Sequence, residues 1–209
     1  MDTIRHIKVV MMMSNIHTLI LIVGKTGSGK SSLIDALCNR RNFKQLISQT
    51  TRPRRNDTDN DHIFVTVDDY LRAKENNEII AETEIAGNYY YATKEQLYEA
   101  DLYTIDPRGR EMLLSMDLPN IRFVTVYISC PNELRMERVI NKRKDSKQAY
   151  SARSFSERQQ FKNFISNEEW DYSIKNIEFA KAYSVLYWIT QVENLWKNHM
   201  EDEQNGDNV

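Results

Sequence analysis

A glycine-rich stretch places a lysine and a hydroxyl side chain at the spacing of a phosphate-binding loop. Residues 24–31 match the pattern G-x-x-x-x-G-K-[ST] at every fixed position. In such loops the glycines let backbone N–H groups approach phosphate oxygens, the lysine reaches the β- and γ-phosphates, and the hydroxyl ligates Mg²⁺. We therefore predict that the chain binds a nucleoside triphosphate. The expected contacts from the loop are Gly24, Lys25, Thr26, Gly27, Ser28, Gly29, Lys30, Ser31 and Ser32.

A second group of residues is suited to binding an anion. Residues 50–55 read Thr-Thr-Arg-Pro-Arg-Arg, so three guanidinium groups fall within four positions. Arginine side chains make bidentate, charge-assisted hydrogen bonds to phosphate oxygens. We interpret this segment as a site for a second phosphate; a solvated or nuclear-targeting basic patch is the alternative.

The elements around the loop predict a parallel α/β fold. Residues 18–23 form an uninterrupted apolar run, as in a buried parallel strand, and residues 31–38 have helical apolar spacing. Further apolar strands are expected at 102–106, 121–128 and 171–175, with helices between them. The polar stretch 144–158 is expected to be mobile, and an aromatic-striped helix is expected at 179–196.

Residues 45–100 contain several β-prone runs and form a predicted insertion between the first helix and the next core strand. We expect strands at 47–49, 62–67, 79–86 and 89–93, the last two joined as a hairpin at Gly87-Asn88. A short helix over 68–76 is expected to be capped by an aspartate.

Composition predicts one globular domain with a mobile part. The chain has 209 residues, 41% of them hydrophobic, and a net charge of −2, which favours neither nucleic acid nor an anionic membrane. Cys38 and Cys130 suggest neither a disulfide framework nor a zinc site. No segment has the length and apolarity of a membrane span or signal peptide, so we expect a cytoplasmic protein.

Taken together, the motifs resemble those of the guanylate kinase family from about residue 18 to residue 196. The resemblance extends beyond the phosphate-binding loop to five further family patterns. They are S-x-T-T-R-x-x-R at 48–55, Y-x-F at 62–64, G-N-Y-Y-G-[ST] at 87–92, D-x-D-x-x-G at 104–109 and D-x-x-I-x-N at 171–176. A guanine-reading N-K-x-D motif of GTPases and an L-S-G-G-Q signature of transport ATPases are absent.

The resemblance implies a fold, two substrates and a set of site residues. The fold would be a P-loop NTPase parallel sheet flanked by helices, with a β-rich monophosphate-binding insertion and a mobile lid. The reaction would be ATP-dependent phosphorylation of a nucleoside monophosphate, GMP or dGMP, with ATP and Mg²⁺ as cofactors and Ser31 as the metal ligand. The implied residues beyond the loop are Arg138 and Asn176 for ATP; Ser48, Arg52, Arg55, His62, Tyr90, Asp106, Glu82 and Glu84 for the acceptor; and Lys30, Arg52, Arg143, Arg153 and Arg158 for catalysis.

The resemblance also predicts how the chain is divided. Residues 1–17 would be an N-terminal extension, with an alternative start at Met11, Met12 or Met13. The P-loop core would comprise 18–44, 101–139 and 159–198, the insertion 45–100, the lid 140–158 and a disordered tail 199–209. We expect a monomer or a homodimer that binds a nucleoside monophosphate and ATP, and neither nucleic acid nor a membrane.

The base-reading positions depart from the family pattern. The family's guanine-reading glutamate falls on Ala81 and its second base contact on Ala92, with Glu82 and Glu84 close by. The first residue of Y-x-F is His62 and the first aspartate of D-x-D is Thr104. The loss of polar partners weakens discrimination between bases. A kinase for another nucleotide or for a ribose bisphosphate is therefore an alternative. A non-catalytic binding module is a further alternative, although such modules typically lose the loop lysine that this chain keeps.

Overall fold

The strands form two separate sheets. The computed structural model describes residues 16–54, 57, 59, 62–85, 87–142 and 146–205. The larger sheet is parallel and consists, in spatial order, of β2 (Gln45–Leu46), β7 (Leu102–Thr104), β1 (His17–Val23), β8 (Ile121–Ser129) and β9 (Tyr172–Lys175). The smaller, mixed sheet consists of β4 (Ile63–Phe64), β3 (Gln49–Thr50), β6 (Asn88–Thr93) and β5 (Ile79–Ile85). The parallel α/β fold predicted from the sequence is confirmed.

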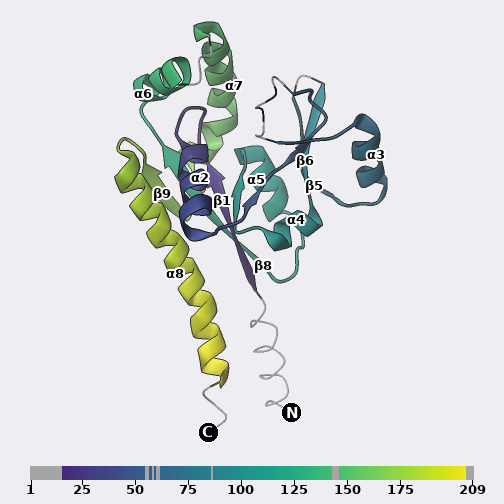
Figure 1. The fold of residues 1–209 in the computed structure, drawn as a ribbon, viewed down its shortest axis with the longest axis vertical. Helices are drawn as coiled ribbons and strands as arrows, with labels where there is room; N and C mark the ends of the chain where they lie inside the picture. The colour runs from purple at the N-terminus through teal and green to yellow at the C-terminus, as the bar shows by residue number, and fades with distance from the viewer. Residues whose placement is uncertain are drawn as a thin grey trace.

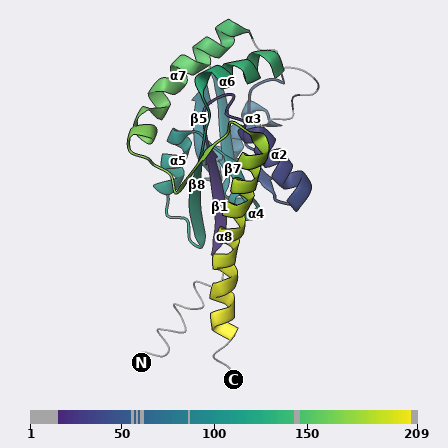
Figure 2. The ribbon, with the colours of Figure 1, turned by 90° about the vertical axis from the view of Figure 1, so that its left-hand side faces the viewer.

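Helices cover both faces of the parallel sheet. On one face lie α2 (Lys30–Arg41) and α8 (Phe179–Asn205), and on the other α4 (Lys94–Glu99), α5 (Pro107–Leu114) and α7 (Lys147–Ser166). Strand β1 is apolar throughout because both of its faces are buried. Leu19 and Leu21 pack toward α4, α5 and α7, whereas Ile20 and Ile22 pack toward α2 and α8. Figure 2 shows α7 and α8 on opposite sides of the sheet.

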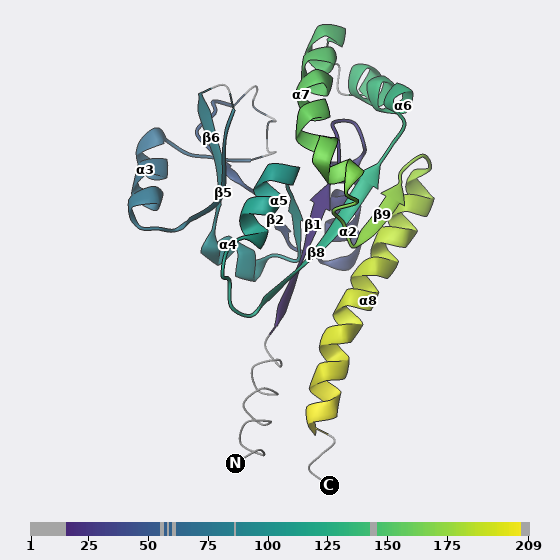
Figure 3. The same ribbon diagram turned by 180° about the vertical axis from the view of Figure 1, so that it is seen from behind.

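The remaining elements surround one end of the parallel sheet. In Figure 1 the smaller sheet and α3 (Val67–Glu75) stand to one side of the core, while α6 (Asn132–Glu137) and α7 lie beyond the end of β1. The view from behind in Figure 3 gives the same arrangement. A π-helical turn, η1 (Arg138–Lys142), follows α6 directly. Carboxyl ends of parallel strands are where such sheets bind ligands, and the loop after β1 opens toward this end.

The polar stretch 144–158 is mostly helical in the part that the structure describes, where the sequence predicted no helix. Helix α7 begins at Lys147, after Ser146, whose side chain accepts a hydrogen bond from the Ala149 N–H. Its buried residues are few and widely spaced: Tyr150, Phe161 and Phe164. The sequence of this helix therefore shows no clear apolar repeat of 3.6 residues. Because α7 continues to Ser166, the expected lid boundary after residue 158 falls inside one helix.

Other element ends also differ. The tail was expected to be disordered from residue 199, but α8 continues to Asn205 through residues of good helix propensity. Helix α3 is capped by Thr66, in a reciprocal capping box with Asp69, and not by an aspartate. The strand expected at 62–67 is therefore cut to β4, and the one at 47–49 is replaced by β2 and β3, of which β2 belongs to the core sheet. The hairpin of β5 and β6 is confirmed.

Within the described ranges, no helix combines the length and apolarity that crossing a membrane requires.

Candidate active site

The phosphate-binding loop connects β1 to α2, and its shape requires glycine. Gly29 is the N-cap of α2 with a φ of 93°, a left-handed conformation that favours glycine. A Cβ atom there would lie 2.3 Å from Nδ2 of Asn176. At Gly24 a Cβ would lie 2.6 Å from the Ile128 carbonyl oxygen of β8. The loop is therefore packed tightly between neighbouring strands, and it presents its backbone at the helix N-terminus, where anions bind.

Two residues distant in sequence complete this side of the site. Asn176 follows β9 and donates from Nδ2 to the Ser28 carbonyl oxygen at 2.8 Å, and Arg138 donates from Nη1 to the same oxygen at 3.3 Å. The Oδ1 atom of Asn176 and the hydroxyl of Ser28 are buried without a hydrogen-bond partner in the described part of the chain. Buried polar atoms of this kind are normally satisfied, so the site fits a polar ligand such as a nucleotide.

A cavity of about 280 Å³ lies over the loop. Among the residues predicted to contact ATP, it is lined by Thr26, Gly27, Gly29, Lys30, Ser31, Ser32, Arg138 and Asn176. Lys30 bonds through its ammonium group to the carbonyl oxygens of Gly24 and Lys25. The described residues contain no cluster of three histidine, cysteine, aspartate or glutamate side chains for a metal. Ser31 lines this cavity, and its hydroxyl would suit a Mg²⁺ ion that also binds phosphates and water, because Mg²⁺ keeps several waters when bound.

A second cavity, of about 670 Å³, lies between the parallel sheet, the smaller sheet and α7. Five of the residues predicted to bind the acceptor line it: Ser48, His62, Glu84, Tyr90 and Asp106. Three of them form a cluster. The Ser48 hydroxyl lies 2.9 Å from Nδ1 of His62, and the His62 ring meets the Tyr90 ring edge-on at 5.2 Å. The pattern S-x-T-T-R and the G-N-Y-Y hairpin therefore meet in space as the sequence predicted.

Arg52 is held beside this cluster with part of its guanidinium unsatisfied. Its Nη1 donates to Oδ2 of Asp59 at 2.9 Å and to the Pro53 carbonyl oxygen at 2.8 Å. Its Nε and Nη2 are buried and have no hydrogen-bond partner in the described residues. The hydrogen bond that Arg52 donates to Asp59, followed by the charges of Asp59 and the neighbouring Tyr90, holds the pKa of Arg52 above its ordinary value. A charged guanidinium with two unsatisfied donors suits a phosphate group, and Arg52 itself lines neither cavity.

The structure does not bring Glu82 to the cavity. Strand β5 carries a β-bulge, because Ile80 pairs with Ala92 and Thr83 with Tyr90, so that Ala81 and Glu82 together oppose one residue of β6. Ala81 has a φ of 51° and lines the cavity.

The Glu82 side chain is directed toward α3. Its carboxylate accepts hydrogen bonds from the Tyr70 hydroxyl at 2.8 Å and from the Lys74 ammonium at 3.1 Å. The assignment of Glu82 to acceptor binding is therefore corrected, whereas Glu84 lines the cavity. Ala92 is fully buried among core side chains.

Asp106 caps a helix and lies in the cavity wall. Its Oδ1 accepts a hydrogen bond from the Gly109 N–H at 2.9 Å, which caps α5, and Asp106 also lines the acceptor cavity. Of the predicted lid arginines, Arg153 lines this cavity, whereas Arg158 is exposed and lines neither cavity. Arg55 and Arg143 lie outside the described residues.

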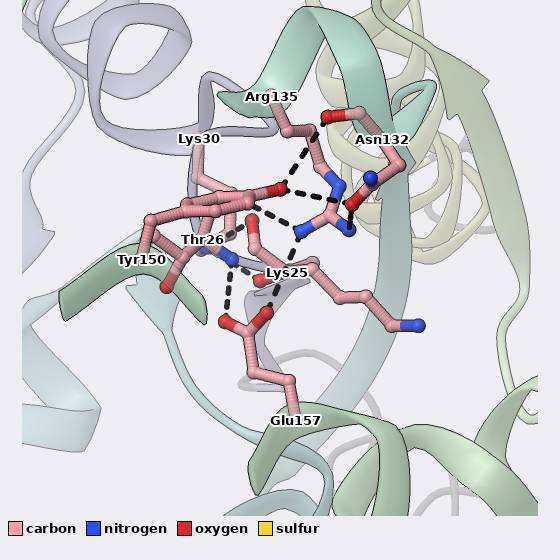
Figure 4. Close-up of polar contacts among 8 residues, drawn as sticks. Lys25, Thr26, Lys30, Asn132, Arg135, Tyr150 and Glu157 are labelled. Atoms are coloured by element: carbon pink, nitrogen blue, oxygen red, sulfur yellow. Dashed lines mark hydrogen bonds and ion pairs between the residues drawn. The ribbon is translucent and has the colours of Figure 1, made fainter. Parts of the chain in front are cut away.

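Some residues at the site were not predicted. Thr83 faces the acceptor cavity because it pairs with Tyr90, and only knowledge of the bulge would have indicated that. Arg135 of α6 and Glu157 of α7 converge on the loop residue Thr26, as Figure 4 shows. Arg135 precedes Arg138 by three positions, so both fall on one side of the helix; that spacing was the available signal. Thr26 lines both cavities and marks where they meet.

Comparison with known proteins gives a consistent result. A model of the family described as guanylate kinase matches residues 16–192. The guanylate kinase of Aliivibrio fischeri is 29% identical over 203 residues, covering 90% of this chain and 94% of its own. That of Pseudomonas fluorescens is 27% identical over 199 residues, covering 88% and 91%. The crystal structure of guanylate kinase from Anaplasma phagocytophilum aligns with a TM-score of 0.57 and 21% identity over 86% of this chain and 87% of that one, a likeness of fold.

The family match spans most of the chain and includes both cavities, the phosphate-binding loop and the smaller sheet. This chain therefore belongs to the guanylate kinase family.

Proposed function

We propose that the protein is a phosphotransferase that uses ATP to convert GMP or dGMP to the diphosphate. The observation that carries the proposal is that two cavities, one over the phosphate-binding loop and one lined by Ser48, His62 and Tyr90, meet at Thr26. A donor and an acceptor phosphate bound in them would approach each other at this residue. Family membership supports the same activity, since its named relatives are guanylate kinases.

The chemistry needs positioning and charge more than covalent participation. A phosphate oxygen of the acceptor attacks the γ-phosphorus of ATP, and the bond from that phosphorus to the β–γ bridging oxygen breaks, releasing ADP. Lys30 would stabilise charge on the ATP side, and Arg52 with its two open donors would orient the acceptor phosphate. A bound Mg²⁺ would neutralise charge on the β- and γ-phosphates, with Ser31 as its protein ligand. Arg153 would add positive charge from the α7 side.

We further propose a division of labour in the fold. The smaller sheet with α3 is the acceptor-binding insertion, and the region from η1 through the first part of α7 is the lid. In this division β2 moves to the core, because it pairs with β7. A cytoplasmic location and a monomeric or homodimeric state stay predictions.

A second candidate is a kinase for another nucleoside monophosphate. The observation that favours it is the non-polar side chain of Ala81 at the bulge and the burial of Ala92, which leave the two family base contacts without polar groups. A coupled assay of ADP release, run with all common nucleoside and deoxynucleoside monophosphates, decides between the candidates. The proposal expects GMP and dGMP to give the highest kcat/KM. A different preferred acceptor would favour the second candidate, and no acceptor-dependent ADP would refute both.

The placement of Glu82 and Glu84 predicts different effects on kcat/KM for GMP when each is replaced by glutamine. A carboxylate accepts both N–H groups of a guanine edge, and a hydrogen bond to a charged group contributes roughly 1.5–3 kcal/mol. We expect Glu84→Gln to lower kcat/KM for GMP by about tenfold or more, because Glu84 lines the acceptor cavity.

Glu82→Gln is the control for this change on the same strand. Its partners are Tyr70 and Lys74, so GMP kinetics should stay within about twofold of wild type. Equal losses in the two variants would show that Glu84 does not read the base.

A further inference from the structure

The carboxylate of Glu157 accepts a hydrogen bond from the phosphate-binding loop. The backbone N–H of Thr26 donates to Oε1 of Glu157 at 2.6 Å, across 131 positions of sequence. Backbone N–H groups of this loop are the groups that bind phosphate oxygens. Glu157 comes from α7, and it also lines the acceptor cavity. An anionic side chain therefore occupies a donor of an anion-binding loop.

The second oxygen of this carboxylate faces a buried cation. Nη1 of Arg135 lies 3.5 Å from Oε2 of Glu157 and donates to the Thr26 carbonyl oxygen at 3.0 Å. Nη2 donates to Oδ1 of Asn132, which also accepts from the Tyr150 hydroxyl at 2.9 Å. Arg135 is only 6% exposed. A buried charge needs a counter-charge, and Glu157 supplies it.

The surroundings of the pair are positive. Lys25 lies in the same loop, and burial followed by the charge of Arg135 lowers its pKa, with Glu157 acting in the opposite direction. Removing the Glu157 carboxylate would leave the positive charges of Arg135 and Lys25 close together without a negative charge between them. An incoming anion would supply that negative charge.

Thr26 also lies where the two cavities meet, so an anion bonded to its N–H stands between donor and acceptor. In the proposed reaction, the γ-phosphate is the part of ATP that must lie closest to the acceptor, and ADP lacks it. The carboxylate and a terminal phosphate therefore compete for the same N–H and the same guanidinium.

We propose that Arg135 contacts the γ-phosphate of ATP, and that Glu157 holds that phosphate's place at Thr26 in the nucleotide-free protein. ATP displaces the carboxylate and takes Arg135 as its counter-ion; ADP leaves the pair intact. Arg135 is thereby a further catalytic residue, and Glu157 sets the discrimination between triphosphate and diphosphate. The inference rests on the proposed function, because it requires a nucleotide in the phosphate-binding loop.

The test compares two nucleotides by calorimetric titration of the full chain with Mg²⁺ and no acceptor. The non-hydrolysable analogue β,γ-imido-ATP stands for the triphosphate and ADP for the diphosphate. Glu157→Gln keeps an oxygen acceptor for the Thr26 N–H but removes the charge, so we expect the Kd of the analogue to fall about tenfold and that of ADP to stay within twofold. Glu137→Gln, an exposed glutamate of α6, controls for loss of a negative charge nearby and should change neither Kd.

Variants of Arg135 should change the Kd of the analogue in the opposite direction. Arg135→Met should weaken binding of the analogue at least tenfold while leaving ADP binding within twofold. Arg135→Lys, which retains the charge in a buried site, should recover part of that loss, and its unfolding temperature shows whether folding is affected. Equal changes in Kd for both nucleotides, or no change in Kd in Glu157→Gln, would overturn this inference but not the proposed function. Failure of wild type to bind either nucleotide would overturn the proposed function and the inference with it.

Discussion

Replacement of Lys30 by alanine is expected to lower kcat by at least a hundredfold while the protein stays folded. The Lys30 side chain lines the cavity over the phosphate-binding loop, within reach of a terminal phosphate. In the reaction its ammonium stabilises charge that develops on the transferring phosphoryl group, and removing one such preorganised donor typically costs ~3–4 kcal/mol in the barrier. In the structure it bonds to carbonyl oxygens of the loop, and the loop's conformation is held independently by its glycines.

Steady-state kinetics with saturating ATP and GMP, together with thermal unfolding, check this expectation. Lys44→Ala, which removes an exposed lysine before β2, serves as the control and should keep wild-type kcat. If Lys30→Ala keeps more than a tenth of wild-type kcat, the catalytic role of the loop is refuted.

Replacement of Arg52 by alanine is expected to raise KM for GMP by about tenfold or more, with KM for ATP nearly unchanged. Arg52 belongs to the smaller sheet's side of the molecule, next to Tyr90, and two of its buried donors have no partner among the described residues. A charge-assisted hydrogen bond contributes roughly 1.5–3 kcal/mol, and two would be lost together. The ATP side is built by a different part of the chain, the loop between β1 and α2.

Arg54 offers a matched control two positions away. Its guanidinium lies over the Phe64 ring at 4.4 Å and donates to the Asp59 carbonyl oxygen, and the residue is exposed. Arg54→Ala should therefore affect KM for GMP much less than Arg52→Ala does. Equal increases in the two KM values of the Arg52 variant would mean that the acceptor phosphate binds elsewhere.

The parts of the site set by local sequence could be predicted. The phosphate-binding loop is fixed by glycine conformation and by an apolar strand before it, so residues 18–31 indicated both structure and ligand class. The parallel sheet followed from the apolar runs, because only a strand buried on both faces needs such a sequence. The meeting of Ser48, His62 and Tyr90 followed from family patterns, and their distances bear out that they lie together.

The parts set by tertiary context could not be predicted. Which side chains of β5 face the acceptor depends on a one-residue bulge between Ile80 and Thr83, because a shift of one residue moves every following side chain to the other face. Helix α7 reads as a polar stretch because most of its surface is exposed and its apolar contacts are few.

The pairing of Arg135 with Glu157 joins two helices through the loop, and no spacing in the sequence encodes such a contact. Local propensity and pattern therefore identified the loop and the sheet, whereas long-range packing decided which charged side chains surround Thr26.

Transfer of labelled phosphate tests the central claim most directly. The purified chain is incubated with Mg²⁺ and ATP labelled at the γ-phosphorus, with GMP as acceptor, and the nucleotides are separated. Direct transfer between the two cavities predicts that the label appears in the β-phosphate of GDP in the same amount as ADP is formed, and that Lys30→Ala transfers it at least a hundredfold more slowly. Label released only as inorganic phosphate, or ADP formed at the same rate without GMP, would contradict the account.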